Sequence, residues 1–389
     1  MPAPPGSKSG AGATADVALP MSARSGVALE ESGAPLWAIV FAGGIGSRFW
    51  PLASPERPKP LLALVTGQPL LADTIGRLQP DIPPDRVLVL TSRDIAPAIR
   101  SIVTGVPEQN ILVEPRPLGT AAALAWGAQE VIRRAGPDAL CVAMHADLAV
   151  GFPDALRLTL RRAAALTQRE QALVAVGIRA TRAEPAFGWL HLDGALDAAA
   201  PVAAGGAAIV RQFVEKPSET DAVQALAAGA YWHGGIVVAA AGELLRALDA
   251  HCVEIRPGLD ALRDGNLPTF VGMIRATSIE RGLLERLPRL LALPGDFGWD
   301  DVGTWASLRR ARELDDDGNG AHGPVHFVDS ESNIVHTERG TVVLYGTHRM
   351  LVVALPGLTF VTPLDRATDL KPLLDALPGS LRINPGGAK

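Results

Sequence analysis

The chain has 389 residues, 48% of them hydrophobic, and a formal net charge of −5. This apolar fraction excludes a fully disordered chain, and the length predicts one large domain with an appendage, or two domains. The small acidic excess argues against a nucleic-acid partner. The two cysteines lie far apart without CxxC spacing, which excludes a disulfide scaffold and a cysteine zinc site and favours a reducing, cytoplasmic location.

Residues 1–35 are rich in Ala, Gly, Ser and Pro and predict a disordered N-terminal extension. The extension lacks the continuous apolar segment of a secretory signal, and Met21 is an alternative start to Met1. Nowhere does the chain approach 18 uninterrupted apolar residues, so we expect no membrane partner.

The first strongly indicated element is the apolar run 37–42, which ends at Gly43-Gly44 and is typical of a strand buried on both faces. Similar runs predict strands at 87–90, 111–113, 139–144, 173–178 and 236–239. Stretches with helical spacing alternate with them, at 120–134, 154–166 and 221–228. This alternation predicts an α/β domain over 36–314 with a Rossmann-like, mostly parallel sheet, in which ligands bind beyond the carboxyl ends of the strands.

The pattern changes after the acidic, turn-rich residues 315–320. Short β-like runs follow at 325–328, 333–336, 341–345, 350–354 and 358–361, and a helical stretch follows at 370–377. They predict a small β-rich domain over 321–389, whose short strands could stack as coils of a β-solenoid.

The segment after the first strand carries the strongest chemical signal. Gly43, Gly44 and Gly46 let the backbone turn sharply and bring its N–H groups close to an anion, while Arg48 and Lys59 add positive charge. A dinucleotide fingerprint would need a glycine where Phe49 stands, and a Walker loop would need a terminal Gly-Lys-Ser/Thr. An ordinary strand-to-helix turn with solvated cations stays the alternative for the glycines alone.

Lysine usage points to the same loop. The chain has 36 basic residues but only five lysines, against 31 arginines (36 minus 5). Two of the five, Lys59 and Lys216, lie in proline-flanked loops. Lysine is a compact point charge on a flexible stem, which suits a moving phosphate oxygen.

Residues 43–59 as a whole resemble the signature of the sugar-1-phosphate nucleotidylyltransferases, in particular the mannose-1-phosphate guanylyltransferases. Further blocks of this family recur in order over roughly residues 36–378, and the ordered series is more specific than any one block. They are Glu114-Pro115 with Gly119-Thr120-Ala121-Ala122, His145-Ala146-Asp147, Phe187-Gly188-Trp189, Phe213-Val214-Glu215-Lys216-Pro217, Trp232-His233-Gly234-Gly235, Ser278-Ile279-Glu280-Arg281, and the run from Trp299 to Trp305.

The resemblance implies a Mg²⁺-dependent transfer in which mannose 1-phosphate attacks the α-phosphorus of GTP, giving GDP-mannose and pyrophosphate. The implied catalytic residues are Arg48, Lys59, Asp147 and Asp301, with Asp147 and Asp301 as metal ligands. The implied nucleotide-binding residues are Ala42, Gly43, Gly44, Gly46, Ser47, Arg48, Lys59, Gly119 and Thr120. The implied sugar-phosphate-binding residues are Gly188, Glu215, Lys216, His233 and Glu280. The family also implies a left-handed β-helix-like C-terminal domain and is compatible with a homodimer.

Several of these residues have a structural alternative. Asp147 follows a predicted strand, where an active-site carboxylate should lie, but it could also cap a turn. Glu280 could either contact the sugar or take part in capping the helix that begins after Ser278. We expect His145 to be packed or hydrogen-bonded rather than a metal ligand, and Asp300 to be a solvated neighbour of the metal site.

Departures from the family pattern concern recognition rather than transfer. Gly119 replaces an asparagine near the base, His233 replaces an asparagine near the sugar, and Leu148 replaces a histidine. Two other functions therefore stay open: transfer with another sugar 1-phosphate or nucleotide, and a non-catalytic sugar-nucleotide sensor. Nicotinamide-dependent redox chemistry is disfavoured by the missing glycine.

Overall fold

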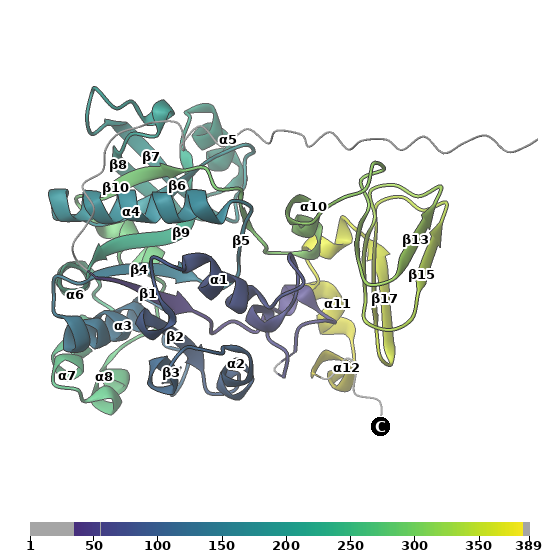
Figure 1. Cartoon of the computed structure of the whole chain (residues 1–389), viewed down its shortest axis with the longest axis horizontal. Helices are drawn as coiled ribbons and strands as arrows, with labels where there is room; N and C mark the ends of the chain where they lie inside the picture. Colours follow the sequence, from purple (N-terminus) through teal and green to yellow (C-terminus); the bar gives the residue numbers. More distant parts are fainter. Residues whose placement is uncertain (1–34, 55, 384–389) are drawn as a thin grey trace, which may run out of the picture.

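The computed structural model describes residues 35–54 and 56–383. The predicted N-terminal extension, apart from its last residue, and the alternative start lie outside the described residues. Figure 1 shows an α/β part and a smaller β part side by side, with the segment after the first strand and the last helices lying between them. None of the described helices is both long and apolar enough to cross a membrane.

A nine-stranded sheet forms the centre of the α/β part, in the order β3-β2-β1-β4-β9-β6-β10-β8-β7. Its strands are β1 (Leu36–Phe41), β2 (Val87–Ser92), β3 (Ile111–Glu114), β4 (Leu140–His145), β6 (Val174–Arg179), β7 (Gly188–Ala195), β8 (Ala208–Glu215), β9 (Tyr231–Ala240) and β10 (Leu291–Gly295). All six predicted strands are present, within two residues at most ends and five at the start of β9. Three further strands of this sheet, β7, β8 and β10, were not predicted.

The expectation of a mostly parallel sheet needs correction. Strands β3, β2, β1 and β4 pair in parallel, but β9 pairs antiparallel with both β4 and β6, and β8 pairs antiparallel with β10 and β7. The sheet is therefore mixed, because an apolar run reveals a buried strand but not its direction. The reversal of β9 brings its first residues to the carboxyl ends of its neighbours, where His233 pairs with Gly177.

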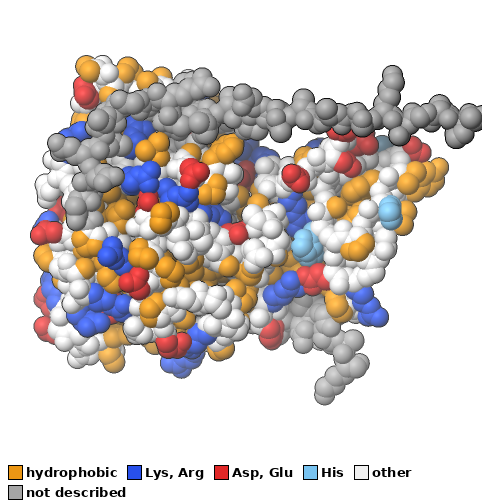
Figure 2. All heavy atoms as spheres, viewed as in Figure 1, with side chains coloured by type: hydrophobic (Ala, Val, Ile, Leu, Met, Phe, Trp, Pro, Cys, Tyr) orange, Lys and Arg blue, Asp and Glu red, His pale blue; other side chains and the backbone are white. Residues whose placement is uncertain are grey.

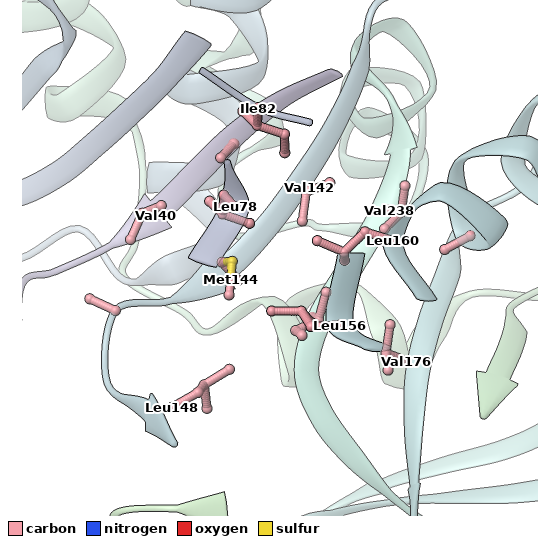
Figure 3. Packing of buried hydrophobic residues seen from close by; sticks show 14 of the residues in the cluster. Val40, Leu78, Ile82, Val142, Met144, Leu148, Leu156, Leu160, Val176 and Val238 are labelled. Carbon is pink, nitrogen blue, oxygen red and sulfur yellow. The ribbon is translucent and has the colours of Figure 1, made fainter. Parts of the chain in front are cut away.

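Helices cover both faces of the sheet. The strands alternate, so that Ala38 and Val40 pack on one face while Trp37 and Ile39 pack on the other. The first face carries α1 (Leu70–Leu78), α2 (Ala96–Ile102), α4 (Pro153–Glu170) and α5 (Glu219–Ala227). The second carries α3 (Thr120–Ala135), α6 (Ala241–His251), α7 (Leu259–Arg263), α8 (Leu267–Met273) and α9 (Ile279–Gly282). Figure 3 shows the first face, where side chains of α1 and α4 meet those of β1, β4, β6 and β9.

The C-terminal part contains every strand that the sequence predicts, and one more. Its strands are β12 (Gly320–His322), β13 (Val325–Val328), β14 (Ile334–Thr337), β15 (Val342–Tyr345), β16 (Met350–Leu355) and β17 (Leu358–Pro363). β12, β14 and β16 stack in parallel, β13 and β15 do the same, and β17 adds an antiparallel edge. The chain thus winds through stacked parallel coils, followed by α11 (Lys371–Ala376) and α12 (Gly379–Ile383).

The two parts share a hydrophobic core. Phe49, Trp50 and Leu62 of the segment after β1 pack with Ile334 and Leu351 of the C-terminal strands. Residues near two further elements join this core. They lie in or beside the antiparallel pair of β5 (Leu148–Val150) with β11 (Trp299–Asp301), and in the short α10 (Leu308–Ala311). The C-terminal strands therefore pack directly on the segment that carries the glycine loop.

Candidate active site

A cleft of about 620 Å³ opens at the carboxyl ends of β1, β3 and β4. It is lined by every site residue that the sequence predicts except Ala42, although these residues come from eight separate segments. Those that line it are Gly43, Gly44, Gly46, Ser47, Arg48, Lys59, Gly119, Thr120, Asp147, Gly188, Glu215, Lys216, His233, Glu280 and Asp301. Ala42 is fully buried instead, and its backbone hydrogen-bonds to β2 through Leu90 and Thr91.

The glycine loop wraps around Lys59. Gly46 has φ 80°, and a Cβ there would lie 2.4 Å from the Lys59 Cβ, so only glycine fits. The Lys59 backbone N–H donates to the Ile45 carbonyl oxygen at 2.9 Å. The side chain is only 9% exposed, and its ammonium lies 5.5 Å from the centre of the Phe49 ring. Lys59 is therefore a positioned buried cation, whereas Arg48 is exposed at the mouth of the cleft.

Two carboxylates face this cation. The Lys59 Nζ donates to Asp147 Oδ2 at 2.6 Å. Asp301 is held nearby because β11 pairs with β5, which puts it opposite Leu148. Burial disfavours the Asp147 carboxylate, but Lys59 and His145 outweigh burial and lower its pKa; burial, with the neighbouring Asp147 charge, raises the pKa of Asp301.

This donor set fits a hard divalent cation. Two carboxylates are what Mg²⁺ commonly takes from protein, with phosphate oxygens and water completing the shell. Within the described residues no group of three or more His, Cys, Asp or Glu side chains is arranged to hold a metal ion, so any cation here would need substrate oxygens. Asp300 is not the solvated neighbour that we expected: it is buried and pairs with Arg310 at 2.6 and 3.2 Å.

The wall of the cleft around Gly119 is built by two loops that are hydrogen-bonded together. Gly119 has φ 81°, and a Cβ there would lie 2.3 Å from the Thr277 carbonyl oxygen. The Thr120 Oγ1 accepts the N–H of Ile279 at 2.9 Å, and the Ala121 N–H donates to the Thr277 carbonyl. The close approach explains why glycine stands here, since any side chain would separate the loops.

The opposite wall carries the remaining predicted residues. A Cβ on Gly188 would lie 2.8 Å from Phe213 and 2.9 Å from the Glu215 carboxylate. Glu215 pairs with Lys216 at 2.8 Å, and burial raises its pKa. Burial lowers the pKa of His233 to about 4, so its ring is neutral near pH 7.

Glu280 completes this wall. The competing capping role belongs to Ser278, whose side chain accepts the Arg281 N–H at the start of α9. Burial acts to raise the Glu280 pKa, but His145 and hydrogen bonds to the carboxylate more than compensate and lower it. Glu280 is thus a carboxylate that lines the cleft.

Sequence reasoning gave no site role to several cleft residues, among them His145, Glu114 and Phe187. His145 packs against Phe41, with ring centroids 5.6 Å apart, as expected of a packed histidine, yet it also lines the cleft. Glu114 also lines the cleft, and burial raises its pKa to about 7. Phe187 forms part of the opposite wall. Glu114 and His145 each end a strand, which was the available signal for both.

Comparison with known proteins agrees with this geometry. Residues 37–318 match the family model described as nucleotidyl transferase. The chain is 30% identical over 351 residues to the alginate biosynthesis protein AlgA of Pseudomonas putida, covering 87% of this chain and 71% of the relative. It is 28% identical to a mannose-1-phosphate guanylyltransferase of Sinorhizobium fredii, covering 87% and 67%.

A solved structure from Thermus thermophilus, described as a mannose-1-phosphate geranyltransferase, superposes with a TM-score of 0.79 at 30% identity. The superposition covers 88% of this chain and 98% of that one, so it includes the C-terminal β part. The family model spans most of the chain and the similarity extends over both parts; the chain is a member of the nucleotidyl transferase family.

Proposed function

We propose that this enzyme joins GTP and mannose 1-phosphate to form GDP-mannose, releasing pyrophosphate. The observation that carries the proposal is the juxtaposition of Lys59, Asp147 and Asp301 between a glycine loop and a wall of polar side chains. The relatives named for mannose-1-phosphate guanylyltransferase activity and for alginate biosynthesis support the choice of substrates.

In this proposal the transfer relies on positioning and on charge. The phosphate oxygen of the sugar phosphate attacks the α-phosphorus in line, and pyrophosphate leaves from the opposite side. The glycine-loop N–H groups and Arg48 bind the triphosphate, while Lys59 stabilises the charge on the transferring phosphoryl group. Asp147 and Asp301 would hold Mg²⁺, which supplies neutralisation of phosphate charge when bound.

The sugar phosphate would lie against the opposite wall. Gly188 leaves room for the sugar to approach the backbone, because a side chain there would meet Phe213. Glu215 and Glu280 would accept hydrogen bonds from sugar hydroxyls, and the exposed Lys216 would bind the phosphate. Neutral His233 would serve where the family has an asparagine, since both groups can exchange hydrogen bonds with a hydroxyl.

One observation favours a second candidate, transfer with a different nucleotide. The family's asparagine could not replace Gly119 with the present backbone, because its Cβ would meet the Thr277 carbonyl. Any base contact made by that asparagine in relatives must be made differently here. Glu114, whose pKa is raised to about 7, lies nearby as an alternative polar group.

We also propose the remaining features that the resemblance implies. Residues 36–314 and 321–389 would act as the catalytic and C-terminal units, and the stacked coils would have the left-handed β-helix form. The start of the second unit is better taken at β12, because Gly320 pairs with Ile334. A homodimer and a reducing, cytoplasmic location complete the proposal, the latter supported by the buried free thiols of Cys141 and Cys252.

The decisive experiment is pyrophosphate release by the purified full chain, with four nucleoside triphosphates crossed against several sugar 1-phosphates, with and without Mg²⁺. We expect a maximum for GTP with mannose 1-phosphate that disappears when the metal is chelated. A maximum for another pair would reassign the substrates. No release from any pair, while nucleotide still binds, would favour the sensor.

A further inference from the structure

A polar network crosses the seam between the glycine-loop segment and the C-terminal coils. Arg57 donates to both carboxylate oxygens of Glu338, at 2.7 and 2.5 Å, although the two residues are 281 positions apart. Figure 2 shows acidic, basic and histidine side chains together where the two parts of the molecule meet. The pair is a direct tether from the C-terminal part to the segment that carries Lys59.

A buried histidine, His336, also contacts the Glu338 carboxylate. Arg312 Nη2 lies 3.3 Å from His336 Nδ1, and His336 Nε2 lies 3.2 Å from Glu338 Oε1. Since a guanidinium can only donate, Nδ1 must accept, and the imidazole proton sits on Nε2 and is donated to Glu338. Arg312 is itself anchored, because its Nε donates to the Leu64 carbonyl at 2.7 Å. His336 and Arg312 thus orient the Glu338 carboxylate through contacts that do not involve Arg57.

A short, stiff connection joins Arg57 to Lys59. The Arg57 N–H donates to the carbonyl and hydroxyl oxygens of Ser54, each at 3.1 Å, and the Ser54 N–H donates back to the Arg57 carbonyl at 3.1 Å. Only Pro58 separates Arg57 from Lys59, and its ring fixes φ, here −69°. A displacement of the Arg57 backbone is therefore passed on to Lys59. The buried Lys59 has to keep its position to donate to Asp147 at 2.6 Å.

We propose that Glu338 is a positioning residue that acts through Arg57 to hold Lys59 in the cleft. It touches no substrate, so its effect must appear in the behaviour of Lys59. The proposal rests on the proposed function only in taking Lys59 as a phosphate ligand. The two side chains are 40% and 24% exposed, so we expect a moderate effect rather than loss of the site.

The first test follows Lys59 directly and needs no activity. The chain has five lysines, which a brief treatment with acetic anhydride and peptide mass spectrometry can follow individually. We expect Glu338→Gln to raise the acetylation rate of Lys59 relative to Lys371 by about two- to fivefold, the opening that loss of one such pair allows. Asp365→Asn is the matched control, because it removes a carboxylate that pairs with an arginine, Arg349, without touching the loop.

The second test separates positioning from general destabilisation. Glu338→Gln and Arg57→Gln should each lower kcat/KM for GTP by about two- to fivefold and leave the KM for mannose 1-phosphate unchanged. The double variant should be no worse than either single one, because both remove the same interaction. Additive losses, or unchanged Lys59 labelling in Glu338→Gln, would overturn the proposal. An inactive wild-type chain would instead remove the proposed function, and the labelling would still decide the role of Glu338.

Discussion

The proposed phosphate end and the proposed sugar end of the cleft hold their charged side chains in different ways. At the phosphate end, Lys59 and Asp147 are buried opposite charges in direct contact, and Asp301 is fixed beside them by strand pairing. At the sugar end, Lys216 is exposed, and Glu280 takes part in none of the ion pairs that the described residues form. The difference shows that the charges at the first end are fixed by a direct ion pair and by strand pairing, whereas the second end has a cation that reaches solvent.

We expect the largest effect from removing one charge at the phosphate end. Asp147→Asn should leave the fold intact but lower kcat by about a hundredfold or more, because a preorganised charge at the reacting phosphate is lost. Steady-state pyrophosphate release and thermal unfolding measure the two effects. Asp300→Asn is the control, since Asp300 pairs with Arg310 and should affect stability rather than turnover. A folded Asp147→Asn with nearly normal kcat would remove Asp147 from the mechanism.

A second change at the same end keeps the charge and alters its shape. Lys59→Arg should lower kcat/KM for GTP at least roughly tenfold, since a planar guanidinium cannot replace a compact ammonium in a buried place. The space is limited by Gly46, whose absent Cβ would lie 2.4 Å from Lys59. Lys371→Arg, on the exposed α11, serves as the control. Equal kinetics in both variants would contradict a positioned role for Lys59.

At the sugar end we expect an effect on binding rather than on turnover. Glu280→Gln should raise the KM for mannose 1-phosphate about tenfold while the KM for GTP stays within about twofold, because one charged hydrogen bond to a hydroxyl weakens. Initial rates over both substrates separate the two constants. Glu243→Gln, which disturbs only a surface pair with Arg246, is the matched control. A change confined to the KM for GTP would contradict the proposal that Glu280 binds the sugar phosphate.

The smallest effect should come from His233. Its pKa is about 4 in the folded chain against a usual 6.5, so the unfolded chain binds the proton more readily between these values. The folded state therefore loses stability as pH falls from 6.5 towards 4, by about 1 kcal/mol between pH 7 and 5.5. His233→Asn should remove this loss in urea unfolding and change the KM for the sugar phosphate less than about threefold. An unchanged pH dependence of unfolding would show that His233 titrates normally.

Much of the phosphate end could be predicted from the sequence. Short apolar runs locate β1 and β4, and the carboxyl ends of such strands are where Gly43 and Asp147 follow. These are local features, because strand burial, glycine turns and motif order all depend on residues that are close together in the sequence. The same reasoning assigned Ala42 to the nucleotide; Ala42 does not line the cleft, and its backbone is hydrogen-bonded within the sheet, so that assignment stays a prediction.

Other features depended on contacts between residues distant in sequence. The sequence could not show that β9 runs antiparallel, and this reversal is what brings His233 to the cleft. Nor could it show that Asp300 pairs with Arg310, which leaves Asp301 alone facing Asp147.

Sequence patterns alone predicted six strands of the central sheet, five strands of the C-terminal part, the glycine loop, most of the charged residues of the cleft and the family. Only the tertiary structure decided strand direction, the shared core of Phe49 and Ile334, and the tether of Arg57 to Glu338. The physical reason is that periodicity and turn chemistry act between near neighbours, whereas strand order, ion pairing and core packing are decided by which surfaces meet after the chain has folded.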